Sequence, residues 1–141
     1  MGNAYGGRVL LSNQDALVFL KTLAAQPKAQ RTFVYLDPPY FVKGPDLYLN
    51  HYERGDHAIV AETLMREQPF RWVPSYDNVA QIRELYAGLR RVRFSLDYSA
   101  RERRTSTELL ILDPRLAFPA SWAKSIPRDC VTPTQRVLNA A

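Results

Sequence analysis

Apolar residues follow two different spacings along the chain, and the change between them predicts the order of strands and helices. Near-continuous apolar runs are typical of strands buried on both faces, and they occur at residues 7–12, 32–37 and 70–77. Apolar residues at helical spacing predict helices at residues 13–26, 57–68 and 79–88. Two further strands with no helix between them are expected at residues 90–100 and 106–113.

This alternation predicts an α/β layer fold with a mainly parallel sheet, and the last two strands predict a C-terminal antiparallel hairpin. We expect residues 1–113 to form one domain. Residues 114–141, where prolines recur and periodicity is lost, are expected to form an irregular tail. Ligands of parallel sheets bind beyond the carboxyl ends of strands. Asp37 and residues 75–77 lie at two such ends, so both are expected on the binding side.

Polar residues next to the predicted helices are expected to cap them. The candidate N-caps are Ser12 or Asn13, Asp56, and Asp77 or Asn78. Gly88 follows the third helix, where a left-handed residue is favoured. Ser75 and Asp77 either cap the following helix or orient Asp37 at the end of the neighbouring strand.

Composition places the chain among ordinary globular proteins, with 46% hydrophobic and 23% charged residues. No apolar stretch approaches the roughly 18 residues of a membrane helix, and the N-terminus does not resemble a signal peptide. The single cysteine, Cys130, excludes an internal disulfide and a multi-cysteine zinc site, and His51 and His57 lack further ligands at regular spacing. We therefore expect a cytoplasmic protein with no membrane partner and no metal. The net charge of +5 is compatible with nucleic acid.

The stretch V-Y-L-D-P-P-Y-F, residues 34–41, contains the most informative chemistry. Pro38 and Pro39 cannot donate to a sheet ladder, so the strand ends at Asp37. A carboxylate, free backbone carbonyls and the ring of Tyr40 remain at its tip. This set suits a planar molecule that carries an amino group. The alternative is a turn in which Asp37 caps backbone amides.

Adenine is a planar molecule of this kind. Its amino nitrogen must become more tetrahedral before it can be methylated, and acceptors for its two hydrogens favour that geometry. The Asp37 carboxylate and the Pro38 carbonyl provide two acceptors. Tyr40 can stack on the ring, and base–aromatic stacking contributes roughly 1–3 kcal/mol per base. Stacking would offset part of the few kcal/mol needed to flip a base out of a duplex.

V-Y-L-D-P-P-Y resembles the catalytic motif of the Dam-like adenine-specific DNA methyltransferases, and the likeness continues through residues 9–113. Similar segments stand in the same order: V-L-L-S-N-Q-D-A-L-V-F-L before the motif, then L-Y-L-N-H-Y-E-R-G-D-H, V-P-S-Y-D-N-V-A-Q-I-R-E-L and L-D-Y-S-A-R-E-R-R-T-S-T-E-L-L-I-L. The resemblance implies a partial Rossmann-like methyltransferase sheet. It also implies methyl transfer from S-adenosylmethionine to the N6 amino group of a flipped adenine in DNA. The implied catalytic residues are Asp37, Pro38, Pro39 and Tyr40, with Asp15 and Asp37 near the methyl donor.

The same family binds its donor through an F-x-G-x-G loop, which has no counterpart in residues 1–141, and neither has its DNA-recognition region. The resemblance therefore implies the C-terminal catalytic half of an enzyme, which is the product of a truncated gene, a fragment, or part of a split enzyme whose F-x-G-x-G half is a separate polypeptide. Two alternatives stay open. One is an inactive nucleic-acid-binding remnant, and the other is methylation of RNA or of protein glutamine, which uses related N-P-P-Y motifs. Two strands of the family's sheet are also missing, so we expect residues 7–12 to pair directly with residues 32–37.

Aromatic and basic residues outside the motif are candidates for DNA contact. Two tyrosines after the motif either wall the base pocket or pack over the sheet edge, and three arginines in the hairpin loop either contact phosphates or form a solvated turn. With Tyr40, the candidates are Tyr48, Tyr52, Arg101, Arg103 and Arg104. Arg90, Arg91 and Arg93 are spread along a predicted strand, and we expect them to serve solubility.

Overall fold

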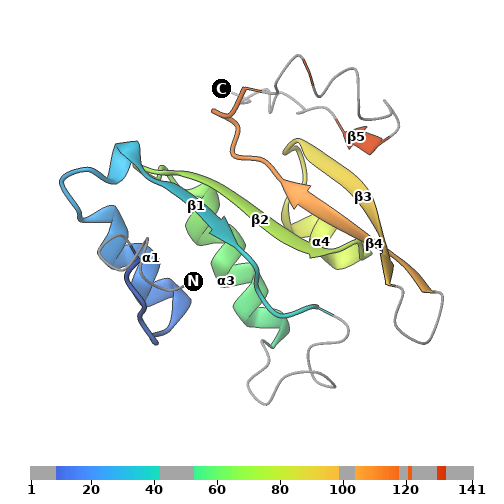
Figure 1. The fold of residues 1–141 in the computed structure, drawn as a ribbon, viewed down its shortest axis with the longest axis horizontal. Helices are drawn as coiled ribbons and strands as arrows, with labels where there is room; N and C mark the ends of the chain where they lie inside the picture. The colour runs from blue at the N-terminus through green and yellow to red at the C-terminus, as the bar shows by residue number, and fades with distance from the viewer. Residues whose placement is uncertain (1–8, 42–52, 99–103, 118–120, 122–129, 133–141) are drawn as a thin grey trace, which may run out of the picture.

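The strands form one mixed sheet in the computed structural model, which describes residues 9–41, 53–98, 104–117, 121 and 130–132. Five strands lie in the order β1-β2-β4-β3-β5 (Figure 1). Their bounds are Phe33–Leu36 (β1), Arg71–Asp77 (β2), Arg91–Tyr98 (β3), Arg104–Ile111 (β4) and Val131–Thr132 (β5). The helices of the described residues are Ala16–Ala24 (α1), Arg54–Met65 (α3) and Ala80–Leu85 (α4), with a 3-10 turn, η1, at Ala29–Arg31.

Only β1 and β2 pair in parallel among the described strands, with Phe33 beside Arg71 and Leu36 beside Pro74. The pairs β2–β4, β3–β4 and β3–β5 are antiparallel. The predictions of an α/β fold and a closing hairpin are confirmed, and the prediction of a mainly parallel sheet is wrong. The hairpin is the reason, because β4 turns back from β3 and takes the place beside β2. β4 therefore lies between β2 and β3, and these two strands run in the same direction.

The main core lies between the sheet and its helices, and α3 and α4 are seen behind the sheet in Figure 1. Trp72 and Tyr76 of β2 belong to this core and are fully buried. The helices contribute Leu20, Val60, Leu64 and Ile82. Val73, which points to the opposite face of β2, belongs to a smaller apolar cluster with Val92 and Leu112. The sheet is therefore buried on both faces near β2.

The segment expected to form the first strand departs most from prediction. Its described part, residues 9–12, forms no strand, and the two leucines in it are 97% and 94% exposed. Within the described residues β2 is the sheet neighbour of β1, and Phe33 and Tyr35 of β1 are more than half exposed. The expected pairing with β1 is therefore wrong for residues 9–12, and residues 7 and 8 lie outside the described residues. A short apolar run does not by itself show that a partner strand is present.

The predicted helix caps are wrong by a few residues each. Asp15 caps α1, and Glu53 caps α3, where Asp56 lies in the first turn and completes a reciprocal capping pair. The residue before α4 is Val79, which forms no side-chain cap. Gly88 has a φ of 82°, so the predicted left-handed residue after the third helix is confirmed.

Part of the segment expected to form a tail belongs to the sheet, because β5 pairs with Arg91 and Val92 at the start of β3. Over the described residues, no helix has the length and apolar character needed to cross a bilayer.

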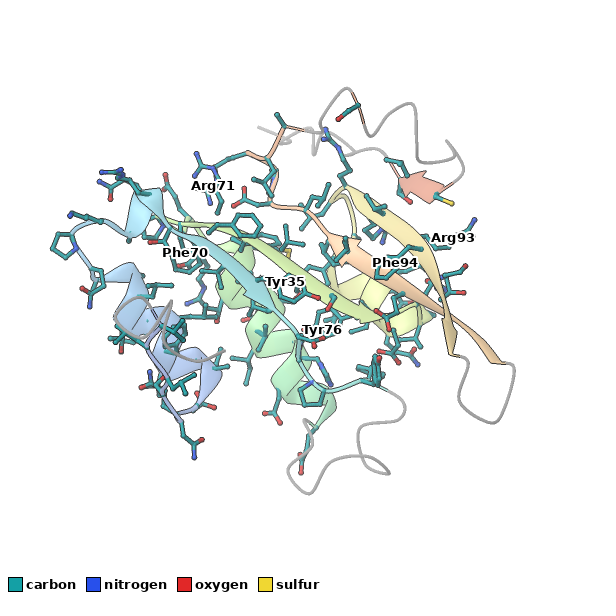
Figure 2. The ribbon with its side chains drawn as sticks, viewed as in Figure 1. Tyr35, Phe70, Arg71, Tyr76, Arg93 and Phe94 are labelled. Carbon is teal, nitrogen blue, oxygen red and sulfur yellow. The ribbon has the colours of Figure 1, made fainter. Side chains whose placement is uncertain are left out.

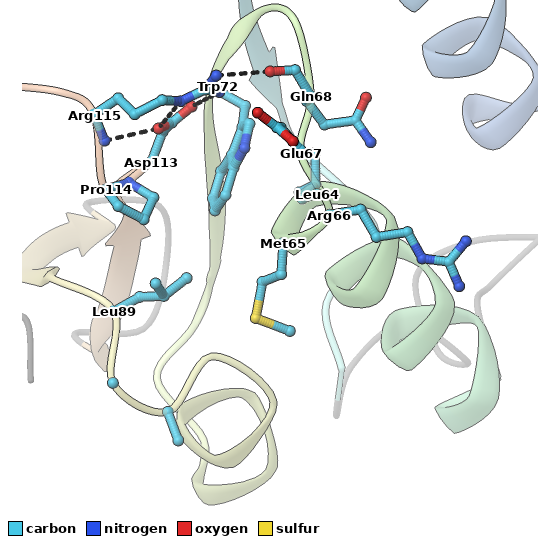
Figure 3. A pocket seen from close by; sticks show the side chains of 12 residues that line it. Leu64, Met65, Arg66, Glu67, Gln68, Trp72, Leu89, Asp113, Pro114 and Arg115 are labelled. Atoms are coloured by element: carbon cyan, nitrogen blue, oxygen red, sulfur yellow. Dashed lines mark hydrogen bonds and ion pairs between the residues drawn. The ribbon is translucent and has the colours of Figure 1, made fainter. Parts of the chain in front are cut away.

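Asp113, which follows β4, is buried and forms an ion pair with Arg115 (Figure 3). Nε and Nη2 of Arg115 lie 2.9 Å and 2.6 Å from the two carboxylate oxygens. Arg115 also donates to the carbonyl oxygens of Gln68 and Phe70, which joins the end of β4 to the loop before β2. Burial alone raises the pKa of Asp113, but the hydrogen bonds and charge of Arg115 outweigh burial and hold that pKa below its usual value.

Replacing Arg115 with methionine is expected to lower the free energy of unfolding at neutral pH by about 2 kcal/mol. Breaking a buried pair costs roughly 3–5 kcal/mol, and the cost is lower here because the Arg115 side chain is 38% exposed. In the variant, burial dominates and raises the pKa of Asp113. The loss should therefore shrink as the pH falls toward about 4 and the carboxyl becomes protonated.

Urea unfolding at several pH values measures this loss. Arg66→Met is the matched control, because Arg66 and its partner Glu62 are 78% and 66% exposed and their pair is expected to contribute little. A loss for Arg115→Met that is the same at every pH would contradict the assignment of a buried charge to Asp113.

Candidate functional site

Asp37 lies just beyond the carboxyl end of β1, next to the end of β2, on the side where ligands of parallel strands bind. The hydroxyl of Ser75, a buried residue of β2, donates to Oδ1 of Asp37 at 3.0 Å. The hydroxyl of Tyr35, labelled on β1 in Figure 2, donates in turn to Oγ of Ser75 at 2.9 Å. This chain of hydrogen bonds fixes the orientation of the Asp37 carboxylate. Of the two roles considered for Ser75, the structure shows the contact with Asp37.

The Tyr40 side chain is hydrogen-bonded to β4, whereas Asp37 is hydrogen-bonded to β2. Its hydroxyl donates to Oε1 of Glu108 at 3.0 Å, and Glu108 is a buried residue of β4. Glu108 lies opposite Asp77 of β2 in the antiparallel register. The bond attaches the far end of the Tyr40 side chain to the sheet, so the ring has a defined orientation. Sequence reasoning assigned no role to Glu108, although the E-L-L segment that contains it was part of the resemblance.

The backbone after Tyr40 is held by Asp77, whose Oδ1 accepts a hydrogen bond of 2.9 Å from the amide of Phe41. Asp77 or Asn78 was expected to cap α4, but the N-cap residue of that helix is Val79, whose side chain has no acceptor. Residues 37–41 are thus bonded to β2 at both ends and to β4 through Tyr40. We call this segment the motif loop. The prolines of the motif loop form no backbone hydrogen bonds with the sheet. Side chains of β2 and β4 hold the loop instead.

An aromatic cluster joins the motif loop, through Phe41, to the buried residues His57 and Tyr76. His57 in the first turn of α3 lies 5.0 Å from the ring of Phe41 and 5.8 Å from the ring of Tyr76, measured between ring centroids. Burial lowers the pKa of His57, and the charges of Asp77 and Asp56 oppose this only in part. His57 is therefore neutral at pH 7 and packs as a flat ring.

A hollow of about 250 Å³ lies beside the motif loop, between α1 and β1. Among the described residues that line it, Asp37 alone is charged and most of the others are apolar. Its wall includes Phe19, Leu20, Tyr35, Pro38 and Pro39. The hollow can accept a flat or apolar group next to the Asp37 carboxylate.

Asp15, the other residue implied near the methyl donor, precedes the α1 residues that line this hollow. Its Oδ1 accepts hydrogen bonds from the amides of Leu17 and Val18 at 2.9 Å and 3.1 Å, and the residue is exposed. Its carboxylate is therefore used as a helix cap in this structure.

The side chains of the remaining candidates are not among those that the structure describes. Tyr48, Tyr52, Arg101 and Arg103 fall outside the described residues, and Arg104 is described only as the first residue of β4. Within the described part of the chain, no group of three or more His, Cys, Asp and Glu side chains is placed to hold a metal ion. No protein-family model and no curated protein matches the chain.

The hydrogen bond between Tyr40 and Glu108 can be tested by a double-mutant cycle of Tyr40→Phe and Glu108→Leu, since leucine leaves no acceptor for the Tyr40 hydroxyl. We expect a coupling energy of about 1 kcal/mol in urea unfolding, because a side-chain hydrogen bond contributes roughly 0.5–1.5 kcal/mol. The matched control is the cycle of Tyr35→Phe and Glu108→Leu, since Tyr35 bonds Ser75 instead. A coupling for Tyr40 no larger than that of the control would show that the bond does not form.

Proposed function

We propose that the chain is the catalytic part of an adenine-specific DNA methyltransferase, acting on the N6 amino group of a flipped adenine. The observation that carries the proposal is the motif loop, in which Asp37 and Tyr40 are each fixed by a hydrogen bond to a buried side chain. Preorganised acceptors and a fixed ring are what a reaction at an aromatic amino group requires. The resemblance of residues 9–113 to Dam-like enzymes supports the same reaction.

Each group of the motif loop has a role in the proposed reaction. The ring of Tyr40 stacks on the flipped base and offsets part of the cost of flipping. The Asp37 carboxylate and the Pro38 carbonyl accept hydrogen bonds from the amino group, which directs its lone pair away from the ring system. Ser75 keeps the Asp37 carboxylate in that orientation. S-adenosylmethionine would supply a methyl group on a positively charged sulfur.

The described residues offer only one side of a site for that donor. The hollow beside Asp37 is mostly apolar, and the Asp15 carboxylate already caps α1. A donor that carries a ribose, an amino group and a carboxylate needs more polar partners than these. We propose that they come from a segment outside these 141 residues that corresponds to the F-x-G-x-G half. Among the described strands β1 has a partner on one side only, and Phe33 and Tyr35 are exposed, which supports this proposal.

The incomplete donor site also supports a second candidate function, which is that of a nucleic-acid-binding remnant without activity. The motif loop would then bind an unpaired base without modifying it. Both functions have DNA as the partner. They differ in whether methyl transfer can be reconstituted.

Asp37→Ala is expected to lower methyl transfer to adenine in DNA by roughly 10²–10³-fold or more, which is the size of effect found when one preorganised stabilising group is removed. Transfer of a labelled methyl group would be measured with the chain and the F-x-G-x-G half of a Dam-like enzyme supplied separately. Glu62→Ala, which removes an exposed carboxylate of α3, is the control. Full turnover by Asp37→Ala would exclude the proposed mechanism. No turnover by the unmodified chain would favour the remnant.

The 141 residues alone are expected to bind S-adenosylmethionine weakly or not at all, because the described residues form one side of the donor site. Isothermal titration calorimetry measures this directly. Low-micromolar affinity for the isolated chain would contradict the proposal that a further segment completes the site.

A further inference from the structure

A second hollow, of about 200 Å³, lies at the opposite edge of the sheet from β1. Three arginines from two elements line it: Arg83 of α4, and Arg91 and Arg93 of β3. The remaining wall includes Asn78 and the short segment that contains β5. No acidic side chain is among the described residues that line it. We call this hollow the arginine pocket.

Two of the arginines lie on β3, at positions where the neighbouring strand β4 has core residues. Arg91 and Arg93 are two residues apart, so both point to the same face of β3. In the register they lie opposite Ile111 and Leu109 of β4, which are buried in the core beneath the helices. Arg90, Arg91 and Arg93 were expected to serve solubility along the strand. The structure places Arg91 and Arg93 in one hollow with Arg83, and Figure 2 shows Arg93 on β3.

Neutral oxygen atoms hold two of the three guanidinium groups in place. Nη1 of Arg91 donates to the carbonyl oxygen of Arg83 at 2.6 Å, and Nη1 of Arg83 donates to Oδ1 of Asn78 at 2.7 Å. These acceptors orient the guanidinium groups without neutralising their charge. Burial lowers the pKa of Arg91, and the nearby charge of Arg83 lowers it further.

We propose that the arginine pocket binds a phosphate group. Guanidinium groups present paired donors that match phosphate oxygens, and several fixed cations in one hollow compensate a doubly or singly charged anion. The phosphate comes either from a nucleic-acid backbone or from a free phosphorylated molecule. Asn78 directly follows Asp77, which holds the motif loop, so both sites adjoin the same end of β2. The backbone source rests on the proposed action on DNA, whereas phosphate binding itself does not.

The proposal is tested with three variants of the chain. Arg93→Gln changes an exposed residue, and Arg91→Gln/Arg93→Gln removes two of the three charges. Arg31→Gln is the matched control, because Arg31 is an exposed arginine in η1, next to β1 at the other edge of the sheet. Circular dichroism verifies that each variant is folded. Arg93→Gln keeps the test valid should the double variant unfold.

Two measurements separate the sources of phosphate. Titration with inorganic phosphate, followed by amide NMR, is expected to give saturable shifts at residues 83 and 91–93 that weaken in Arg93→Gln and not in Arg31→Gln. Fluorescence anisotropy with a short labelled duplex at several salt concentrations gives the salt slope of binding. Loss of one phosphate contact is expected to reduce that log–log slope by about 0.9 in the pocket variants alone.

Each outcome has one meaning. Saturable shifts with a reduced slope support a nucleic-acid phosphate in the pocket. Saturable shifts with an unchanged slope support a free phosphorylated ligand. Saturable shifts with no binding of DNA support the same ligand, and the lack of DNA binding would also count against the proposed action on DNA. Absence of saturable shifts together with equal slopes for pocket and control variants would overturn the proposal.

Discussion

The candidate site depends on how the sheet holds a segment that cannot pair with it. Pro38 and Pro39 end the ladder of β1, so the motif loop has no regular backbone hydrogen bonds there. Ser75, Asp77 and Glu108 take their place with bonds of 3.0, 2.9 and 3.0 Å to Asp37, Phe41 and Tyr40. Because these three side chains come from β2 and β4, the site requires these two strands to be neighbours. The return of β4 beside β2 is therefore the feature of the topology on which the site depends.

The same topology leaves the two edges of the sheet unlike each other. At one edge β5 pairs with β3, and the arginine pocket lies under that edge. At the other edge β1 has β2 as its described neighbour, Phe33 and Tyr35 are more than half exposed, and residues 9–12 form no strand. The hollow beside Asp37 lies at this second edge, between α1 and β1. Under the proposed function, this is the side on which a further segment would complete the donor site.

Much of the local structure could be predicted from the sequence, because it depends on residues close together in the chain. The strands at β1, β2, β3 and β4, the end of β1 at the prolines and the left-handed Gly88 follow from periodicity and backbone sterics. Strand order could not be predicted, because a hairpin can pair with either side of a sheet at little difference in local preference. Glu108 and the arginine pocket were missed for a related reason: each depends on side chains from different elements, and periodicity carries no signal for such contacts. The strand at residues 7–12 was predicted wrongly because a short apolar run does not show whether a partner strand is present.

Binding of an unpaired adenine tests the role of the motif loop most directly, since it needs neither the methyl donor nor a recognition sequence. The affinity of the chain would be compared for two duplexes, one fully paired and one with a single adenine opposite an abasic site. The unpaired adenine avoids much of the flipping cost of a few kcal/mol, so it should bind about tenfold more tightly or better. Tyr40→Ala should remove the preference, and an unpaired thymine in the same position should show little. Equal affinity for the paired and unpaired adenine duplexes would contradict a base-binding role for Asp37 and Tyr40.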